Sequence, residues 1–207
     1  MQELLGKKIG MTQVFDATGI VIPVTVIEAG PCFVVRTKSV ESDGYVSVEI
    51  GFESIIEKKS NKPMLGIFKK ANIPPKKYLH EFRVDKTDGY SVSQEIKADI
   101  FKVGEHVDIS GVSIGKGFAG SVKRHHFNRG PMSHGSKSHR LPGSSGAGTS
   151  PGNIKKGMRR AGQLGNKKIT VKNLAVVTVD AEKNIMLVRG AVPGSEGSLL
   201  VIRKRVK

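Results

Sequence analysis

The chain has 207 residues, and its formal net charge of +16 already constrains the partners it can have. Cys32 is the only cysteine, which excludes an intramolecular disulfide and a zinc cluster built on cysteines. No apolar run approaches the roughly 20 residues needed to cross a bilayer, and residues 1–15 lack the apolar core of a secretory signal. These features predict a soluble cytoplasmic protein in a reducing compartment.

The positive charge is concentrated in one third of the chain. Residues 1–108 hold 15 Lys or Arg and 15 Asp or Glu, whereas residues 109–179 hold 13 basic and no acidic residues. Because like charges repel one another, such a segment needs a polyanion, and nucleic acid is the commonest one. The alternative is a solvated surface that aids solubility, but such surfaces normally mix both signs.

The first third of the chain predicts strands. Residues 9–15 and 20–30 are rich in Val, Ile and Thr and flank a DATG turn, which indicates a hairpin. Residues 32–40 and 45–52 continue the pattern. Residues 56–97 contain the breakers KKSNKP and NIPPKK, so we expect a small inserted α/β subdomain there, with a short helix over residues 64–71.

Strand alternation resumes at residues 102–114 and again in the last 45 residues, over 167–180, 185–192 and 199–206. The N- and C-terminal parts therefore share a sheet, and closing that sheet into an antiparallel barrel would remove its exposed edges. The predicted fold is mainly β. It has a barrel body of residues 1–55, 98–115 and 165–207, the insertion, and a long basic loop over 116–164.

The loop contains a short predicted helix at residues 118–127 and no periodic pattern after it until Ile154. A structureless stretch of this length is usually functional or disordered. If residues 128–153 ran out and back, each arm of about 13 residues would reach about 40 Å. Such a finger buries too little apolar surface to order by itself, so we expect it to order on its partner.

Four histidines in the loop raise the alternative of a metal site: His125, His126, His134 and His139. Their spacing matches no common zinc pattern, and the segment supplies no carboxylate to complete the site or orient an imidazole. Ser–His hydrolysis also needs an orienting acid, and the nearest in sequence are Asp108 and Asp180, both outside the loop. Assembly of a triad from distant residues stays open. The residues predict no metal, no cofactor and no enzyme.

RNA binding accounts for all the residue types of the loop together. Lys and Arg neutralise phosphates, and His, Ser, Thr and Asn donate to phosphate and sugar oxygens. Glycines let the backbone approach closely, and the lack of aromatic residues from Asn128 to Asn166 favours wedging among folded RNA helices over stacking on single strands. The predicted RNA contacts are Lys116, Lys123, Arg124, His125, His126, Arg129, His134, Lys137, His139, Arg140, Lys155, Lys156, Arg159, Arg160, Lys167 and Lys168.

Residues 101–124, FKVGEHVDISGVSIGKGFAGSVKR, resemble the signature of the large-subunit ribosomal protein L3 family. The likeness extends to LLGKKIGMTQVF near the start and to AGQLGNKKITVKNL near the end, in the bacterial arrangement. The matching positions of the signature are Phe101, Asp108, Gly111, Ser113, Gly115, Lys116, Gly117, Gly120 and Arg124.

The resemblance implies an elongation-factor-like barrel with an α/β insertion, and a loop that threads through 23S rRNA toward the peptidyl transferase centre. It also implies binding near the 3′ end of that RNA early in subunit assembly, beside ribosomal proteins L14 and L19. The loop tip would be Ser144, Ser145, Gly146, Ala147, Gly148 and Thr149.

The chain departs from the family pattern at two places. Where some members carry a methylated glutamine in Gly-Gln-Asn-Gln-Thr-Pro, this chain has GAGTSP, so we expect no such modification. Lys155 stands where relatives often have an aromatic residue, which suggests phosphate contact in place of packing. The predicted function is that of a structural rRNA-binding protein of the large subunit; the alternative is a non-ribosomal RNA chaperone or DNA-binding protein.

Overall fold

A computed structural model describes residues 3–85, 87 and 89–205 of the chain. The chain divides into two compact units, which we describe separately: unit 1 comprises residues 1–112 and 168–207, and unit 2 comprises residues 113–167. None of the helices in the described residues is long and apolar enough to span a membrane.

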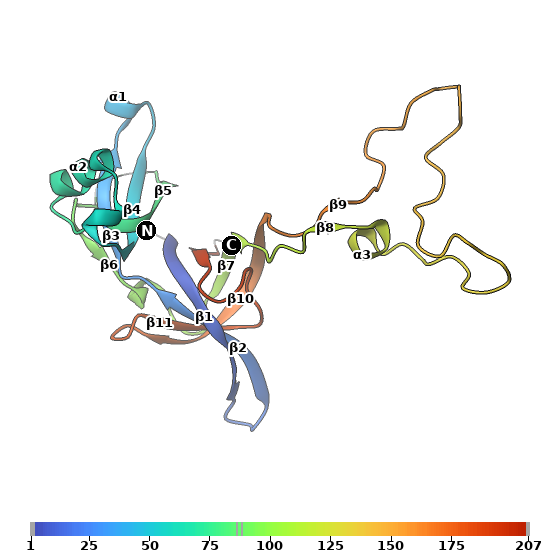
Figure 1. The fold of residues 1–207 in the computed structure, drawn as a ribbon. Helices are drawn as coiled ribbons and strands as arrows, with labels where there is room; N and C mark the ends of the chain where they lie inside the picture. Colours follow the sequence, from blue (N-terminus) through green and yellow to red (C-terminus); the bar gives the residue numbers. More distant parts are fainter. Residues whose placement is uncertain (1–2, 86, 88, 206–207) are drawn as a thin grey trace. The chain divides into compact units, whose positions relative to one another are not determined.

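Unit 1 contains a closed antiparallel barrel of six strands, as the sequence predicts (Figure 1). Each strand pairs with its neighbours around the ring in the order β1-β12-β7-β10-β11-β2, so the closed part of the sheet has no free edge. The strands are β1 (Glu3–Phe15), β2 (Val21–Ala29), β7 (His106–Val112), β10 (Lys168–Asp180), β11 (Ile185–Arg189) and β12 (Leu199–Lys204).

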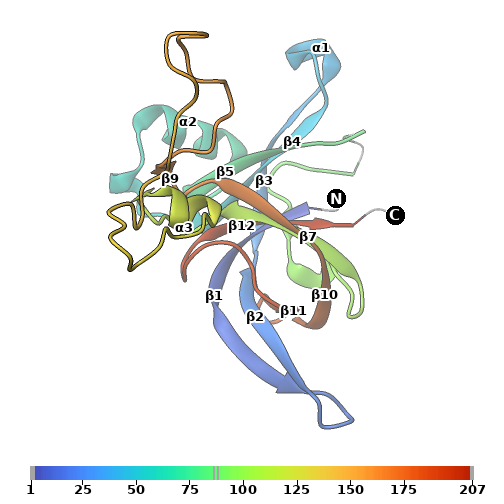
Figure 2. The same cartoon turned by 90° about the vertical axis from the view of Figure 1, so that its right-hand side faces the viewer.

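The barrel interior is filled by alternate residues of its strands. Pairs two apart, such as Val107 and Ile109 of β7 or Leu200 and Ile202 of β12, are completely buried, because side chains two apart on a strand point to the same face. Beyond the barrel, β1 and β2 continue as a two-stranded hairpin that projects from it (Figure 2). Phe15 and Val21, paired across this hairpin, are exposed.

A second sheet has four strands in the order β5-β4-β3-β6. Its strands are β3 (Cys32–Lys38), β4 (Ser47–Ser54), β5 (Lys76–Arg83) and β6 (Glu95–Ile96). The helical segments are α1 (Val40–Asp43), η1 (Glu57–Lys59), α2 (Lys62–Ala71) and η2 (Ala98–Ile100). The helix predicted over 64–71 is therefore confirmed as α2.

The predicted division placed all of residues 1–55 in the barrel, and for β3 and β4 this assignment is wrong. Both strands pair within the second sheet, where β4 lies between β3 and β5. The physical reason is that alternation shows which side of a strand is buried but does not identify the strand that hydrogen-bonds to it. The wider division into body, insertion and loop stays a prediction.

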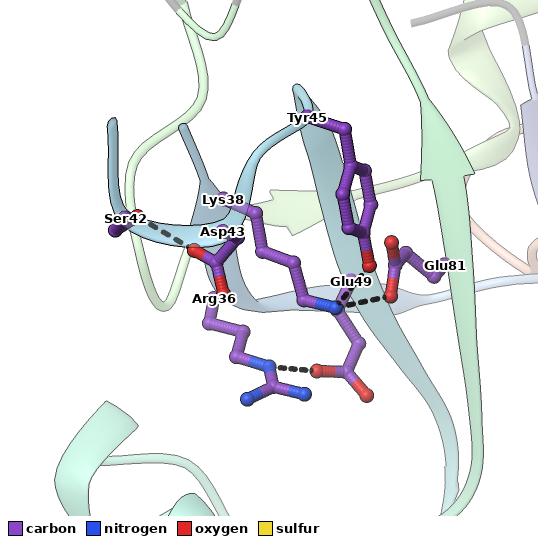
Figure 3. A network of polar contacts seen from close by, with 7 residues as sticks. All are labelled: Arg36, Lys38, Ser42, Asp43, Tyr45, Glu49 and Glu81. Carbon is purple, nitrogen blue, oxygen red and sulfur yellow. Dashed lines mark hydrogen bonds and ion pairs between the residues drawn. The ribbon is translucent and has the colours of Figure 1, made fainter. Parts of the chain in front are cut away.

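Polar contacts hold three strands of the second sheet together (Figure 3). The ammonium group of Lys38 donates to the Tyr45 hydroxyl and to Glu81, each at 2.6 Å, and Arg36 forms an ion pair with Glu49. Helix α2 covers part of the sheet by burying Phe68 and Ala71 against Val35. The helix ends at Asn72, which adopts the left-handed backbone conformation.

Candidate nucleic-acid interface

Unit 2 begins as a two-stranded ribbon that brings its two ends together. Backbone hydrogen bonds join Ser113 to Lys167 at 2.9 Å and Lys116 to Leu164 at 2.8 Å. The ribbon continues into β8 (Phe118–Ala119) and β9 (Gly162–Gln163), which pair with each other. These short strands were missed by sequence analysis, because two residues are too few to show alternation.

Glycine is required at one point of this ribbon. Gly165 has a φ of +70°, and a Cβ at that position would overlap the carbonyl oxygen of Ile114 on the facing arm. Glycine alone adopts this conformation at no steric cost, so the close approach of the two arms depends on it.

A short helix, α3 (Ser121–His125), follows β8 and confirms the helical element predicted within residues 118–127. Two of its side chains bind one backbone oxygen: Arg124 Nη1 donates to the carbonyl of Arg160 at 2.6 Å, and His125 Nε2 lies 2.9 Å from the same atom. Both residues belong to the predicted RNA contacts. The structure gives them an internal role, because they join the outgoing and returning arms.

Beyond α3 the chain forms two successive loops rather than one out-and-back finger (Figure 1). The first loop closes where the Gly130 amide donates to the carbonyl of His139 at 3.0 Å. The His139 ring contributes a second contact, since its Nδ1 lies 2.9 Å from the Pro131 carbonyl. The chain turns at His134 and Gly135, which both have positive φ.

The second loop starts where the chain has returned to the junction, the region in which α3 contacts Arg160 and the outgoing and returning arms meet. Ser144, Phe127 and Arg160 line one small pocket of 180 Å³, although they are far apart in sequence. The prediction of one finger with two equal arms is therefore wrong, because the chain returns to its starting region once between the two loops. Ser144, expected at the tip, lies at this junction, and Gly146–Thr149 fall within the second loop.

Most cations of unit 2 face solvent, and the unit contains no acid to pair with them. All of residues 113–167 are described, and this segment contains no Asp or Glu, so no ion pair forms within it. Of the predicted contacts, Arg124, His125, His139 and Arg160 are half-buried. The exposed ones are Lys116, Lys123, His126, Arg129, His134, Lys137, Arg140, Lys155, Lys156, Arg159, Lys167 and Lys168, the last of which begins β10 in unit 1.

Large apolar side chains are also exposed along unit 2, and sequence analysis passed over them. Phe118 is 80% exposed and Leu141 is 69% exposed, and Ile114, Met132 and Ile154 are more than half exposed. A segment that leaves these side chains in water has no core of its own. Exposed apolar groups beside cations suit a partner that offers both phosphates and stacked bases.

The histidines of the loop do not converge on a common point. His125 and His139 each contact a backbone carbonyl, at the junction and in the first loop respectively. Across the described ranges 3–85, 87 and 89–205, no three His, Cys, Asp or Glu side chains gather where they could hold a metal ion. The arrangement is that of an extended cationic surface.

Comparison with known proteins supports the same conclusion. The family model described as Ribosomal protein L3 matches residues 80–185. The chain is 52% identical to large ribosomal subunit protein uL3c of Porphyra purpurea over 201 residues, which is 97% of this chain and 98% of that protein. It is 54% identical to large ribosomal subunit protein uL3 of Carboxydothermus hydrogenoformans over 204 residues, 99% of this chain and 97% of the relative. Given this similarity over nearly its whole length, the chain belongs to the ribosomal protein L3 family.

Proposed function

We propose that this ribosomal protein is a structural constituent of the large subunit and that unit 2 binds 23S rRNA. The family it belongs to is a structural component of the ribosome and not an enzyme. The observation that carries the RNA assignment is the complete absence of acidic residues from 109–179, next to a stretch, 1–108, with equal numbers of acids and bases. A segment of 71 residues in which every Lys, Arg, Asp or Glu is basic is complementary to a phosphate backbone.

The two units have complementary tasks in this proposal. The barrel is a packed body with a buried core, so it fixes the point from which unit 2 leaves. Unit 2 has two closed loops without a core, and it orders fully when phosphates neutralise its cations. Binding energy is therefore gained mainly by the loops.

The finer parts of the proposal rest on the family resemblance. The protein would bind near the 3′ end of 23S rRNA, promote an early step of subunit assembly and extend its loops toward the peptidyl transferase centre. Ribosomal proteins L14 and L19 would be its neighbours. The names of its relatives, large ribosomal subunit proteins, support the general location.

The test is a salt titration of binding between the full chain and a 23S rRNA 3′ fragment. If about 6–10 phosphates are neutralised, affinity falls about 10³–10⁵-fold between 50 and 200 mM salt. In the variant K155Q/K156Q/R159Q the slope of log affinity against log salt falls by about 2–3, since each lost phosphate contact removes about 0.7–0.9.

The matched control is K58Q/K59Q/K62Q, which removes the same charge from exposed positions of unit 1. This control should keep the wild-type slope. Salt-independent binding, or equal losses in both triple variants, would overturn the assignment of RNA binding to unit 2.

A further inference from the structure

A groove of 540 Å³ lies within unit 1, between β5 and the outer wall of the barrel. Its volume falls in the range of about 300–1,000 Å³ typical of small-molecule sites. Five strands contribute to it, and most of its residues are outside the predicted RNA contacts. The lining residues that matter below are His80 and Phe82 of β5, Glu3 of β1, Asp108 and Ser110 of β7, Lys168, Thr170 and Lys172 of β10, and Val201 and Arg203 of β12.

The barrel wall of the groove is built by strand register. Lys168, Thr170 and Lys172 alternate along β10 and therefore share one face. Thr170 lies opposite Ser110, which in turn lies opposite Val201, so these three form a row across three strands. The hydroxyls of Ser110 and Thr170 are 2.7 Å apart, next to the two lysines.

Each carboxylate of the groove already has one partner in the protein. Glu81 accepts from Lys38 at 2.6 Å (Figure 3), Glu3 pairs with Arg203, and Asp108 accepts a hydrogen bond from the backbone N–H of Asn173 at 2.8 Å. The ammonium groups of Lys168 and Lys172, in contrast, have no acidic partner within ion-pair distance among the residues described. The charge left over in the groove is therefore positive.

Two polar atoms in the groove are buried without a hydrogen-bond partner in the described part of the chain: His80 Nδ1 and Glu3 Oε2. Leaving such an atom unpartnered costs about 1–3 kcal/mol, so an incoming group that pairs with it is favoured. The His80 ring is stacked against Phe82, with centroids 4.6 Å apart. Burial, and then the charge of Lys168, lower the pKa of His80, so at neutral pH its ring offers one donor and one acceptor.

We propose that this groove binds a single unstacked nucleotide of ribosomal RNA. The phosphate lies at Lys168 and Lys172, the sugar hydroxyls at Ser110 and Thr170, and the base against the His80 ring. RNA-binding proteins commonly read splayed bases by stacking on aromatic or imidazole rings and by hydrogen bonds to their edges. The inference rests on the proposed function, and it adds a base-reading site on the body of the protein.

The groove fits a nucleotide better than an acidic peptide. The Glu3 and Asp108 carboxylates would repel a peptide carboxylate, whereas they can accept hydrogen bonds from the exocyclic amino group of a base. Adenine, cytosine and guanine carry such a group and uracil does not, so the groove should discriminate against uridine nucleotides.

The test is a titration of the full chain with AMP, CMP, GMP and UMP, followed by amide chemical shifts in nuclear magnetic resonance spectra. We expect shifts at His80, Ser110 and Thr170 that are larger for AMP, CMP or GMP than for UMP and for inorganic phosphate. The variant V201F fills the groove without changing charge and should weaken binding by about tenfold or more. The control V21F adds the same bulk at an exposed hairpin position. The variant K168Q/K172Q removes the proposed phosphate contacts and should also weaken nucleotide binding, whereas its control K69Q/K70Q, at exposed positions of α2, should not.

Three outcomes would overturn the inference: equal shifts with phosphate alone, unchanged nucleotide binding in V201F, or shifts with a tetraglutamate peptide and none with nucleotides. Failure of the proposed function is distinguishable from these. If the wild-type chain binds the rRNA fragment with a steep salt dependence but shows no nucleotide shifts in the groove, only the groove inference fails. If it does not bind that fragment, the proposed function itself fails.

Discussion

The side chain of Arg124 donates a hydrogen bond from Nη1 to the backbone carbonyl of Arg160, 2.6 Å away and 36 residues further along the chain. This contact joins the outgoing and returning arms at the point where the two loops of unit 2 begin. Gly162 leaves room for it, because a Cβ there would lie 2.6 Å from the Arg124 guanidinium. A residue expected to contact only RNA therefore also shapes the surface that RNA would meet.

Replacing Arg124 with leucine should loosen this junction and leave the barrel intact. The hydrogen bond is charge-assisted and worth about 1.5–3 kcal/mol, so amide hydrogen exchange should accelerate across α3 and β9. Exchange in β7 and β10 should stay unchanged. Lys123→Gln is the control, since that neighbouring side chain is exposed; equal acceleration in both variants would contradict the role of the contact.

Gly165→Ala should open the ribbon at the base of unit 2. The substitution places a Cβ against the Ile114 carbonyl at a φ of +70°, a conformation that costs a non-glycine residue about 1–2 kcal/mol. The measurement is hydrogen exchange at the Lys116 and Leu164 amides, which donate across the ribbon to the carbonyls of Leu164 and Gly117. Gly148→Ala, with no atom within 4 Å of the added Cβ, should have no effect on these amides.

Removing residues 130–157 and joining the ends with two glycines should leave unit 1 folded. The deleted residues belong to the two loops, and the buried core lies elsewhere. The free energy of unfolding, measured in urea, should change by less than about 1 kcal/mol, while affinity for the rRNA fragment is lost. Unfolding of the truncated protein would show that the loops are part of the core.

Phe118→Ala should weaken rRNA binding without altering its salt dependence. The Phe118 ring is 80% exposed at the start of unit 2, and stacking of a base on an aromatic ring is worth about 1–3 kcal/mol. Because no charge is removed, the slope of log affinity against log salt should match that of the wild type. A changed slope would mean that the substitution displaces neighbouring cations.

Glu81→Gln should reduce the dependence of stability on acid pH. Hydrogen bonds from Lys38 and then Tyr45 lower the pKa of Glu81 from 4.5 to about 2. A lowered pKa in the folded state means that the carboxylate stabilises the protein above about pH 4.5 and loses this contribution as the pH falls toward 2. Urea unfolding from pH 7 to pH 2 should therefore show a shallower decline in the variant.

The control for this prediction is Glu182→Gln, an exposed position in the turn after β10. It should reproduce the wild-type pH profile. At neutral pH the loss in Glu81→Gln should be modest, about 1 kcal/mol or less, because the ion pair is partly exposed. A profile for Glu81→Gln that is identical to wild type would show that Lys38 does not stabilise the charged form.

Much of the fold could be predicted because the signals were local. Alternation in residues 199–206 and 167–180 predicted strands that became β12 and β10, and the closing of the barrel followed from the need to satisfy their edges. The helix α2 was predicted from a short apolar pattern between breakers. The membership of β3 and β4 in the second sheet could not be predicted, since strand partners are chosen by contacts far apart in sequence.

The sequence by itself determined that one third of this protein is a cationic segment without acids, and that property excludes most partners except a polyanion. Only the tertiary structure decided that the segment forms two loops, that the Arg124 side chain donates a hydrogen bond to the Arg160 carbonyl, and that a groove lies beside β5. The physical reason is that charge is additive along a chain and can be counted. Loop closure and grooves depend on hydrogen bonds and register between residues far apart in sequence, which no local pattern encodes.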